Sequence, residues 1–141
     1  MKKKLNWQIN LEKGNFYLKH FKYYSAREEF SKIINNNQTP KPWEIEARFL
    51  VHITNFHIKR LNNWRDFYCN SYSDFAVSEF STFQKSFLYA ILVTKQKSRW
   101  KNVINRIQKD LNSDPEIVEK YKNLLIHLPL EFQIIFKMTF Y

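Results

Sequence analysis

The sequence has 141 residues, among them a single cysteine, Cys69, and a single glycine, Gly14. One cysteine excludes an internal disulfide and any multi-cysteine zinc site, and it fits a reducing compartment. One glycine and four prolines leave little of the turn chemistry that a many-stranded sheet needs at its hairpins. The scarcity of these residues therefore predicts an all-α fold.

Long apolar runs are also missing from the sequence. The most apolar run, Phe87 to Val93, is far shorter than a membrane-spanning helix requires. The basic start MKKK is followed by alternating polar residues, where a secretory signal would have an apolar segment. We therefore expect no membrane span and no secretion, and a protein of the cytoplasm or of an organelle interior such as the plastid stroma.

Apolar, aromatic and basic residues are abundant instead. Hydrophobic residues make up 44% and aromatic residues 18% of the chain, which indicates a folded protein. The length is typical of one domain, so we expect a single domain over residues 1–141. The net charge of +10 favours an anionic partner, although many Lys, Asn, Ile, Phe and Tyr residues are also typical of AT-rich coding DNA.

The spacing of apolar residues predicts six to eight helices, arranged as an antiparallel bundle or a short stack of helical hairpins. Polar stretches predict internal loops at 35–42 and 69–74. The expected helices cover residues 5–20, 23–35, 42–60, 77–91, 98–111, 115–127 and 129 onward, with a further helical start at 64–68.

Three of these segments carry specific predictions about burial. In the first helix, Leu5, Ile9, Glu12 and Phe16 fall near one face, Leu11 and Leu18 widen it, and the apolar ones predict its buried side. Trp100 lies on an apolar stripe with Ile104 and Ile107, so we expect it in the core. In the last helix, the expected core residues are Leu130, Ile134 and Met138.

The stretch around the only glycine resembles a tetratricopeptide hairpin, in which a small residue lets the first helix approach its neighbour and an aromatic follows three residues later. Gly14 and Tyr17 stand in those places, with Ala26 and Phe30 at the matching places of the second helix. Gly14 is therefore expected to face the helix that carries Ala26 and Phe30. Phe21 stands where that hairpin commonly has a glycine at the turn.

Residues 14–68 also resemble a small all-helical family of unknown function found in bacteria and some plastid genomes. The run YYSARE from Tyr23 to Glu28 corresponds to the family's Tyr-Phe-x-Ala-His-Glu, and His57 precedes a basic pair as the family's later histidine does. The resemblance implies an all-helical fold and a polar cluster of Arg27, Glu28 and His57. Arg27 replaces the family's histidine and Asn62 its glycine, and because a guanidinium cannot bind a metal, an ion-pair cluster is expected there.

Candidate chemistry elsewhere is sparse. His52 and His57 are five residues apart, roughly 140° around a helix, so they cannot hold one metal ion together. The sequence has no nucleophile-elbow context and no glycine-rich phosphate loop. We expect no metal, no cofactor and no enzymatic activity, with a small enzyme using Glu28 and His57 as the third hypothesis.

The first hypothesis is a non-enzymatic adaptor or assembly module that binds a protein partner, as a subunit of a larger complex. Its expected contact residues are Tyr17, His20, Phe140 and Tyr141. The alternative is a basic protein that binds RNA or DNA through the face from Lys95 to Lys109. The cations expected at that interface are Lys95, Lys97, Arg99, Lys101, Arg106 and Lys109, together with Lys59, Arg60 and Arg65.

Overall fold

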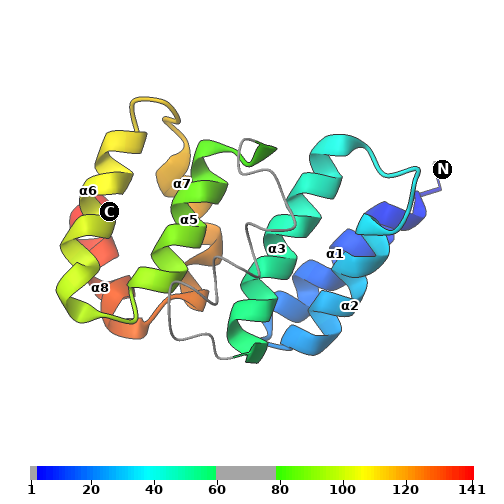
Figure 1. Cartoon of the computed structure of the whole chain (residues 1–141), viewed down its shortest axis with the longest axis horizontal. Helices are drawn as coiled ribbons and strands as arrows, with labels where there is room; N and C mark the ends of the chain where they lie inside the picture. The colour runs from blue at the N-terminus through cyan, green and yellow to red at the C-terminus, as the bar shows by residue number, and fades with distance from the viewer. Residues whose placement is uncertain (1–2, 60–78) are drawn as a thin grey trace. The chain divides into compact units, whose positions relative to one another are not determined.

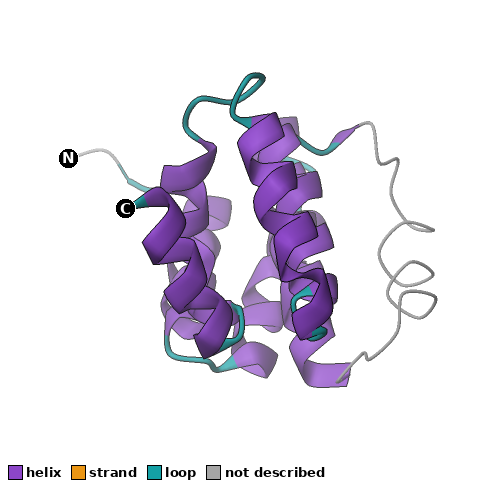
Figure 2. Cartoon of the chain, turned by 90° about the vertical axis from the view of Figure 1, so that its left-hand side faces the viewer, coloured by secondary structure: helices purple, strands orange, loops and turns teal. Residues whose placement is uncertain are grey.

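The computed structural model describes residues 3–59 and 79–141, and in these two ranges it contains seven α-helices and no strand (Figures 1 and 2). The predicted all-α fold of six to eight helices is thereby confirmed. The chain divides into two compact units, Met1–Leu61 and Asn62–Tyr141, and each has its own core. Whether the two units fold as the expected single domain stays a prediction.

Several predictions fall outside the described residues. They are the helical start at 64–68, the loop at 69–74, Cys69, and the two cations Arg60 and Arg65. Lys59 is the last residue of a described helix.

Unit 1 consists of α1 (Asn6–Lys19), α2 (Tyr23–Ile34) and α3 (Lys41–Lys59), with α2 packed against both of the others (Figure 1). The loop predicted at 35–42 corresponds to residues 35–40, because α2 ends at Ile34 and α3 already begins at Lys41. Its turn is held by Thr39, whose Oγ1 donates to the carbonyl of Ile33 at 2.9 Å. α3 then begins with Glu44 in its first turn, where the helix dipole stabilises a carboxylate.

Gly14 of α1 packs against the ring of Phe30 of α2. A Cβ atom at this position would lie 2.7 Å from Cδ1 and 2.9 Å from Cζ of Phe30, which is tighter than carbon atoms tolerate. Ala26 and Phe30 are fully buried on the facing side of α2. The expected role of the glycine as a close-contact residue is confirmed.

The buried face of α1 differs from the expected one. Trp7, Gly14 and Leu18 are buried, whereas Leu5 and Phe16 are exposed, so the prediction for these two residues is wrong. Two apolar stripes at helical spacing run along α1, and the close contact at Gly14 selects which one faces α2. Trp7 also stacks on Trp43 of α3, with ring centroids 5.7 Å apart.

The turn between α1 and α2 places Phe21 in the left-handed region, with φ of 62°. The amide of Lys22 donates to the carbonyl of Tyr17 at 2.9 Å, which closes the C-terminal end of α1. A glycine adopts this conformation without steric cost, but for an L-residue with a side chain it costs roughly 1–2 kcal/mol.

Unit 2 consists of α5 (Thr82–Val93), a short 3₁₀ turn η2 (Lys97–Arg99), α6 (Trp100–Asp110), α7 (Ile117–Leu124), a second turn η3 (Leu125–His127) and α8 (Leu130–Phe140). α5 begins at a capping box, in which Ser81 Oγ accepts from the amide of Gln84 at 3.2 Å and Gln84 Oε1 accepts from that of Ser81 at 2.9 Å. This cap explains why α5 starts later than the apolar stripe suggests.

The core of unit 2 is aromatic. Tyr121 of α7 is fully buried, with its ring centroid 5.3 Å from that of Phe87 and 5.6 Å from that of Phe136. Its hydroxyl hydrogen-bonds Ser86 Oγ at 2.6 Å, which satisfies the polar end of a buried ring. Trp100 is buried as expected, and its Nε1 donates to the carbonyl of Thr94 at 2.7 Å.

Candidate binding surfaces

The last helix, α8, exposes a row of apolar side chains that we call the C-terminal stripe: Leu130, Ile134, Met138 and Tyr141. Their exposed fractions are 72%, 52%, 80% and 65%. Leu130, Ile134 and Met138 are expected in the core from their spacing, and this prediction is wrong. Phe132 and Phe136 are buried in their place, because these rings pack on Trp100 and Tyr121.

Three of the four members of the stripe follow the helix. Spacings of four residues put Leu130, Ile134 and Met138 along one side of α8 over about 12 Å at 1.5 Å per residue, whereas Tyr141 follows the last residue of the helix and its ring lies 6.3 Å from that of Phe136. Next to Leu130 the surface is hollowed by a cavity of about 460 Å³. The residues that line the cavity are Thr94, Lys95, Lys97, Trp100, Pro129, Leu130 and Glu131.

Cations border the stripe on several sides. Lys137 is exposed on α8 itself, and the Nζ of Lys122 lies 4.3 Å from the centroid of the Tyr141 ring. Near the start of α8, Lys97 pairs with Glu131 at 3.8 Å, both side chains being well exposed. Burial lowers the pKa of Lys95, which also lines the cavity.

The four residues expected to contact a protein partner lie in different units. Tyr141 ends the C-terminal stripe, while Phe140 is half-buried, with its ring 4.8 Å from that of Phe136. In unit 1, Tyr17 is half-buried, and the exposed His20 lies 4.5 Å from the ring of Phe16. The role of these four residues in binding a partner stays a prediction, and Leu130, Ile134 and Met138 are not among them.

The basic segment from Lys95 to Lys109 has three exposed cations, Arg99, Lys101 and Lys109, in addition to Lys95 and Lys97. Arg106 is half-buried: its guanidinium lies 4.9 Å from the centroid of the Tyr89 ring, and its Nε lies 3.6 Å from Asp110 Oδ2. Trp100 is buried beneath this segment. The basic segment therefore has positive charge at its surface, but its tryptophan, Trp100, packs in the core.

The polar residues suggested by the family resemblance do not form one cluster. Arg27 Nη1 donates to Asn55 Oδ1 at 2.9 Å, and His57 stacks on the Tyr23 ring at 4.4 Å. Burial raises the pKa of Tyr23 to about 12. Glu28 is exposed on α2, and in the described part of the chain no ion pair or hydrogen bond joins it to Arg27 or His57.

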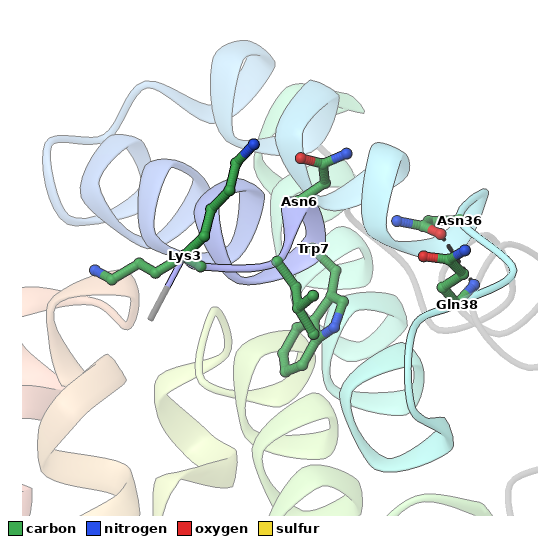
Figure 3. A pocket seen from close by; sticks show the side chains of 7 residues that line it. Lys3, Asn6, Trp7, Asn36 and Gln38 are labelled. Atoms are coloured by element: carbon green, nitrogen blue, oxygen red, sulfur yellow. Dashed lines mark hydrogen bonds between the residues drawn. The ribbon is translucent and has the colours of Figure 1, made fainter. Parts of the chain in front are cut away.

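A second cavity, of about 220 Å³, lies at the start of α1 (Figure 3). Asn36 Oδ1 accepts from the backbone amide of Gln38 at 2.9 Å and Lys4 pairs with Glu12, whereas the buried Nε1 of Trp7 has no hydrogen-bond partner among the described residues. The lining consists of Lys3, Lys4, Leu5, Asn6, Trp7, Asn36 and Gln38. These residues include no carboxylate, imidazole, thiol or hydroxyl that could act as an acid, base or nucleophile.

Among residues 3–59 and 79–141, no group of three or more His, Cys, Asp or Glu side chains is placed to hold a metal ion. In the same two ranges, no helix has the length and apolar character that crossing a membrane requires.

Comparison with protein-family models, with curated proteins and with solved structures finds no match to this chain. The resemblance of residues 14–68 to the small all-helical family therefore stays a prediction.

Proposed function

We propose that the protein is a helical docking module, and that its C-terminal stripe binds an acidic amphipathic helix of a partner protein. The observation that carries the proposal is the exposure of Leu130, Ile134 and Met138 on a helix whose opposite face is already buried. Helices that are apolar on all sides occur where both faces are covered. A contiguous exposed apolar patch is typical of an interaction surface.

The shape of the stripe favours a helix as the occupant. Side chains at i, i+4 and i+8 of α8 fit the apolar face of a second helix of about two turns or more. The cavity beside Leu130 offers room for a larger side chain at one end of the row. Burying a large aliphatic side chain contributes about 1.5–3 kcal/mol, so the row is long enough for micromolar affinity after the cost of association.

Charge favours a different protein over a second copy of this chain. Lys137 is exposed on α8, while Lys97 pairs with Glu131 at 3.8 Å and Lys122 pairs with Glu119 at 3.0 Å. Two copies would each carry a net charge of +10 and would repel one another. An acidic rim on the partner helix would instead complement these lysines and speed association.

The test uses the full chain and a labelled synthetic helix of about four turns, with leucines on one face and glutamates on the others. We expect the chain to bind this peptide in the micromolar range and to bind a lysine version of it at least tenfold more weakly. Ile134→Glu should abolish binding, because it places a charge in the middle of the apolar row. Leu5→Glu, at an exposed leucine of unit 1, is the matched control and should bind normally.

Circular dichroism checks that both variants keep their helices. Equal loss of binding in both variants, or no preference for the acidic peptide, would contradict the proposal. Sedimentation equilibrium tests whether the protein dimerises through the stripe. A dimer that forms in the unchanged protein but not in Ile134→Glu would show that the stripe binds a second copy of the chain, and it would overturn the proposal of a different partner.

A further inference from the structure

We infer that the α1–α2 turn of unit 1 binds single-stranded nucleic acid, with unpaired bases stacked on Phe16, Phe21 and Tyr24 and phosphates held by Lys19 and Lys22. We call these five residues the turn surface. Its residues belong to unit 1, whereas those of the C-terminal stripe and of the basic segment from Lys95 to Lys109 belong to unit 2. It adds a second kind of ligand to the proposed function and does not depend on it.

The first observation is local composition. Residues 13–27 contain four cations and five aromatic residues and no acidic residue. They form the end of α1, the turn and the start of α2, two helices that lie side by side (Figure 1). The end of α1, the turn and the start of α2 therefore combine aromatic rings with positive charge, as single-strand binding proteins do.

The second observation is exposure. Phe16, Phe21 and Tyr24 are 57%, 55% and 67% exposed, although large aromatic residues are usually buried where a core can take them. The Arg27 guanidinium lies 5.4 Å from the centroid of the Tyr24 ring, and the same guanidinium is anchored on Asn55 at 2.9 Å. This contact restrains the ring at the surface, so less freedom is lost when a base stacks on it.

The third observation is the backbone at Phe21. A phenylalanine at φ of 62° is strained where a glycine would not be, and more than half of its side chain is exposed. Folding alone therefore favours glycine at this position. A strained residue that presents a large ring to solvent is the kind of outlier from which a binding role is inferred.

The fourth observation is the availability of the lysines. Lys19 and Lys22 are exposed, and within the described ranges neither pairs with an acidic side chain. Lys32 and Lys4, by contrast, pair with Glu29 and Glu12. Unpaired surface ammonium groups can contact phosphates without first breaking an ion pair.

Aromatic rings favour unpaired bases over a duplex. The faces of bases are accessible only where the bases are unpaired, whereas lysines alone would hold a duplex equally well through its phosphates. An anionic membrane also attracts lysines, but the exposed side chains here are rings and a histidine rather than the aliphatic face of an amphipathic helix.

The experiment measures fluorescence anisotropy of a labelled oligouridylate of about 12 nucleotides with the full chain over a range of salt concentrations. We expect tighter binding to the single strand than to a duplex of equal length. Phe16→Ala with Tyr24→Ala should weaken binding about tenfold or more, because each lost stack removes favourable energy. Lys19→Gln with Lys22→Gln should reduce the slope of log K against log salt by roughly 1.4.

The matched control is Lys101→Gln with Lys109→Gln, which removes the same charge from exposed positions of α6. We expect this control to change affinity less than twofold.

Phe21→Gly separates binding from folding: it should weaken binding severalfold while the unfolding midpoint in urea stays the same or rises. A fall in that midpoint that accounts for the lost binding would overturn the role of Phe21.

Three results would overturn the inference as a whole. One is an equal or larger loss in the α6 control, which would assign binding to the basic segment. Another is equal affinity for duplex and single strand. The last is binding of the chain to vesicles of phosphatidylserine and phosphatidylcholine, lost in the Phe16 and Tyr24 variant, without binding to the oligonucleotide.

Discussion

At the scale of single residues, Gly14 shows how one missing side chain sets a helix contact. Without a Cβ, α1 comes close enough for its backbone to touch the fully buried ring of Phe30. A glycine within a helix costs about 1 kcal/mol relative to alanine, so its presence here has to be offset by this contact. The ring cannot swing away, because it lies in the core between α1 and α3.

We therefore expect Gly14→Ala to lower the free energy of unfolding by about 1–2 kcal/mol, since overpacking outweighs the gain in helix propensity. Urea denaturation followed by circular dichroism measures the change. Asn15→Ala, at the exposed neighbouring position, is the control and should stay within about 0.5 kcal/mol of the unchanged protein. A more stable Gly14→Ala variant would show that the two helices are not held at this distance.

At the scale of elements, α8 has two apolar faces, and only one of them is used in the core of unit 2. Phe132 and Phe136 are fully buried, while Ile134 lies between them in sequence and is half exposed. The two faces have similar hydrophobicity, so the distinction depends on what each side chain touches.

Phe136→Ala should destabilise the protein by about 3–5 kcal/mol, because it removes a fully buried ring and leaves a cavity. Ile134→Ala should change the free energy of unfolding by no more than about 0.5 kcal/mol, as expected for an exposed helix position. Urea denaturation of both variants gives the comparison. Similar losses in the two variants would mean that the C-terminal stripe is part of the fold and is not available to a partner.

At the scale of the whole molecule, each unit holds a tyrosine whose pKa is raised by burial: Tyr23 in unit 1, to about 12, and Tyr121 in unit 2. The unfolded chain releases these protons near pH 10, before the folded chain does. A raised folded pKa means that the stabilisation is fully present below pH 10 and is lost as pH rises above it. Both units should therefore lose stability in alkali.

We expect the unfolding midpoint in urea to fall as pH rises from about 10 to 12, in addition to any loss from lysine deprotonation. Tyr23→Phe should make this decline shallower, because phenylalanine has no proton to lose. The difference between the variant and the unchanged protein is the readout, which cancels the contribution of the lysines. Parallel declines in the two proteins would show that burial does not hold the Tyr23 proton.

The sequence by itself determined the fold class, most helix boundaries, the loop at 35–42 and the contact between Gly14 and Phe30. These features depend on local signals: helical periodicity, caps, prolines and one missing Cβ.

Only the tertiary structure decided which side of α1 and α8 is buried, and that Phe21 is strained and exposed at the turn. Helical spacing permits two apolar stripes on each of these helices. On α1, one stripe contains Leu5 and Phe16, and the other contains Trp7 and Leu18. The choice between stripes depends on residues distant in sequence, such as Phe30 for α1 and Tyr121 for α8. Burial is a property of such contacts, and the proposed binding surfaces are the faces that these contacts leave exposed.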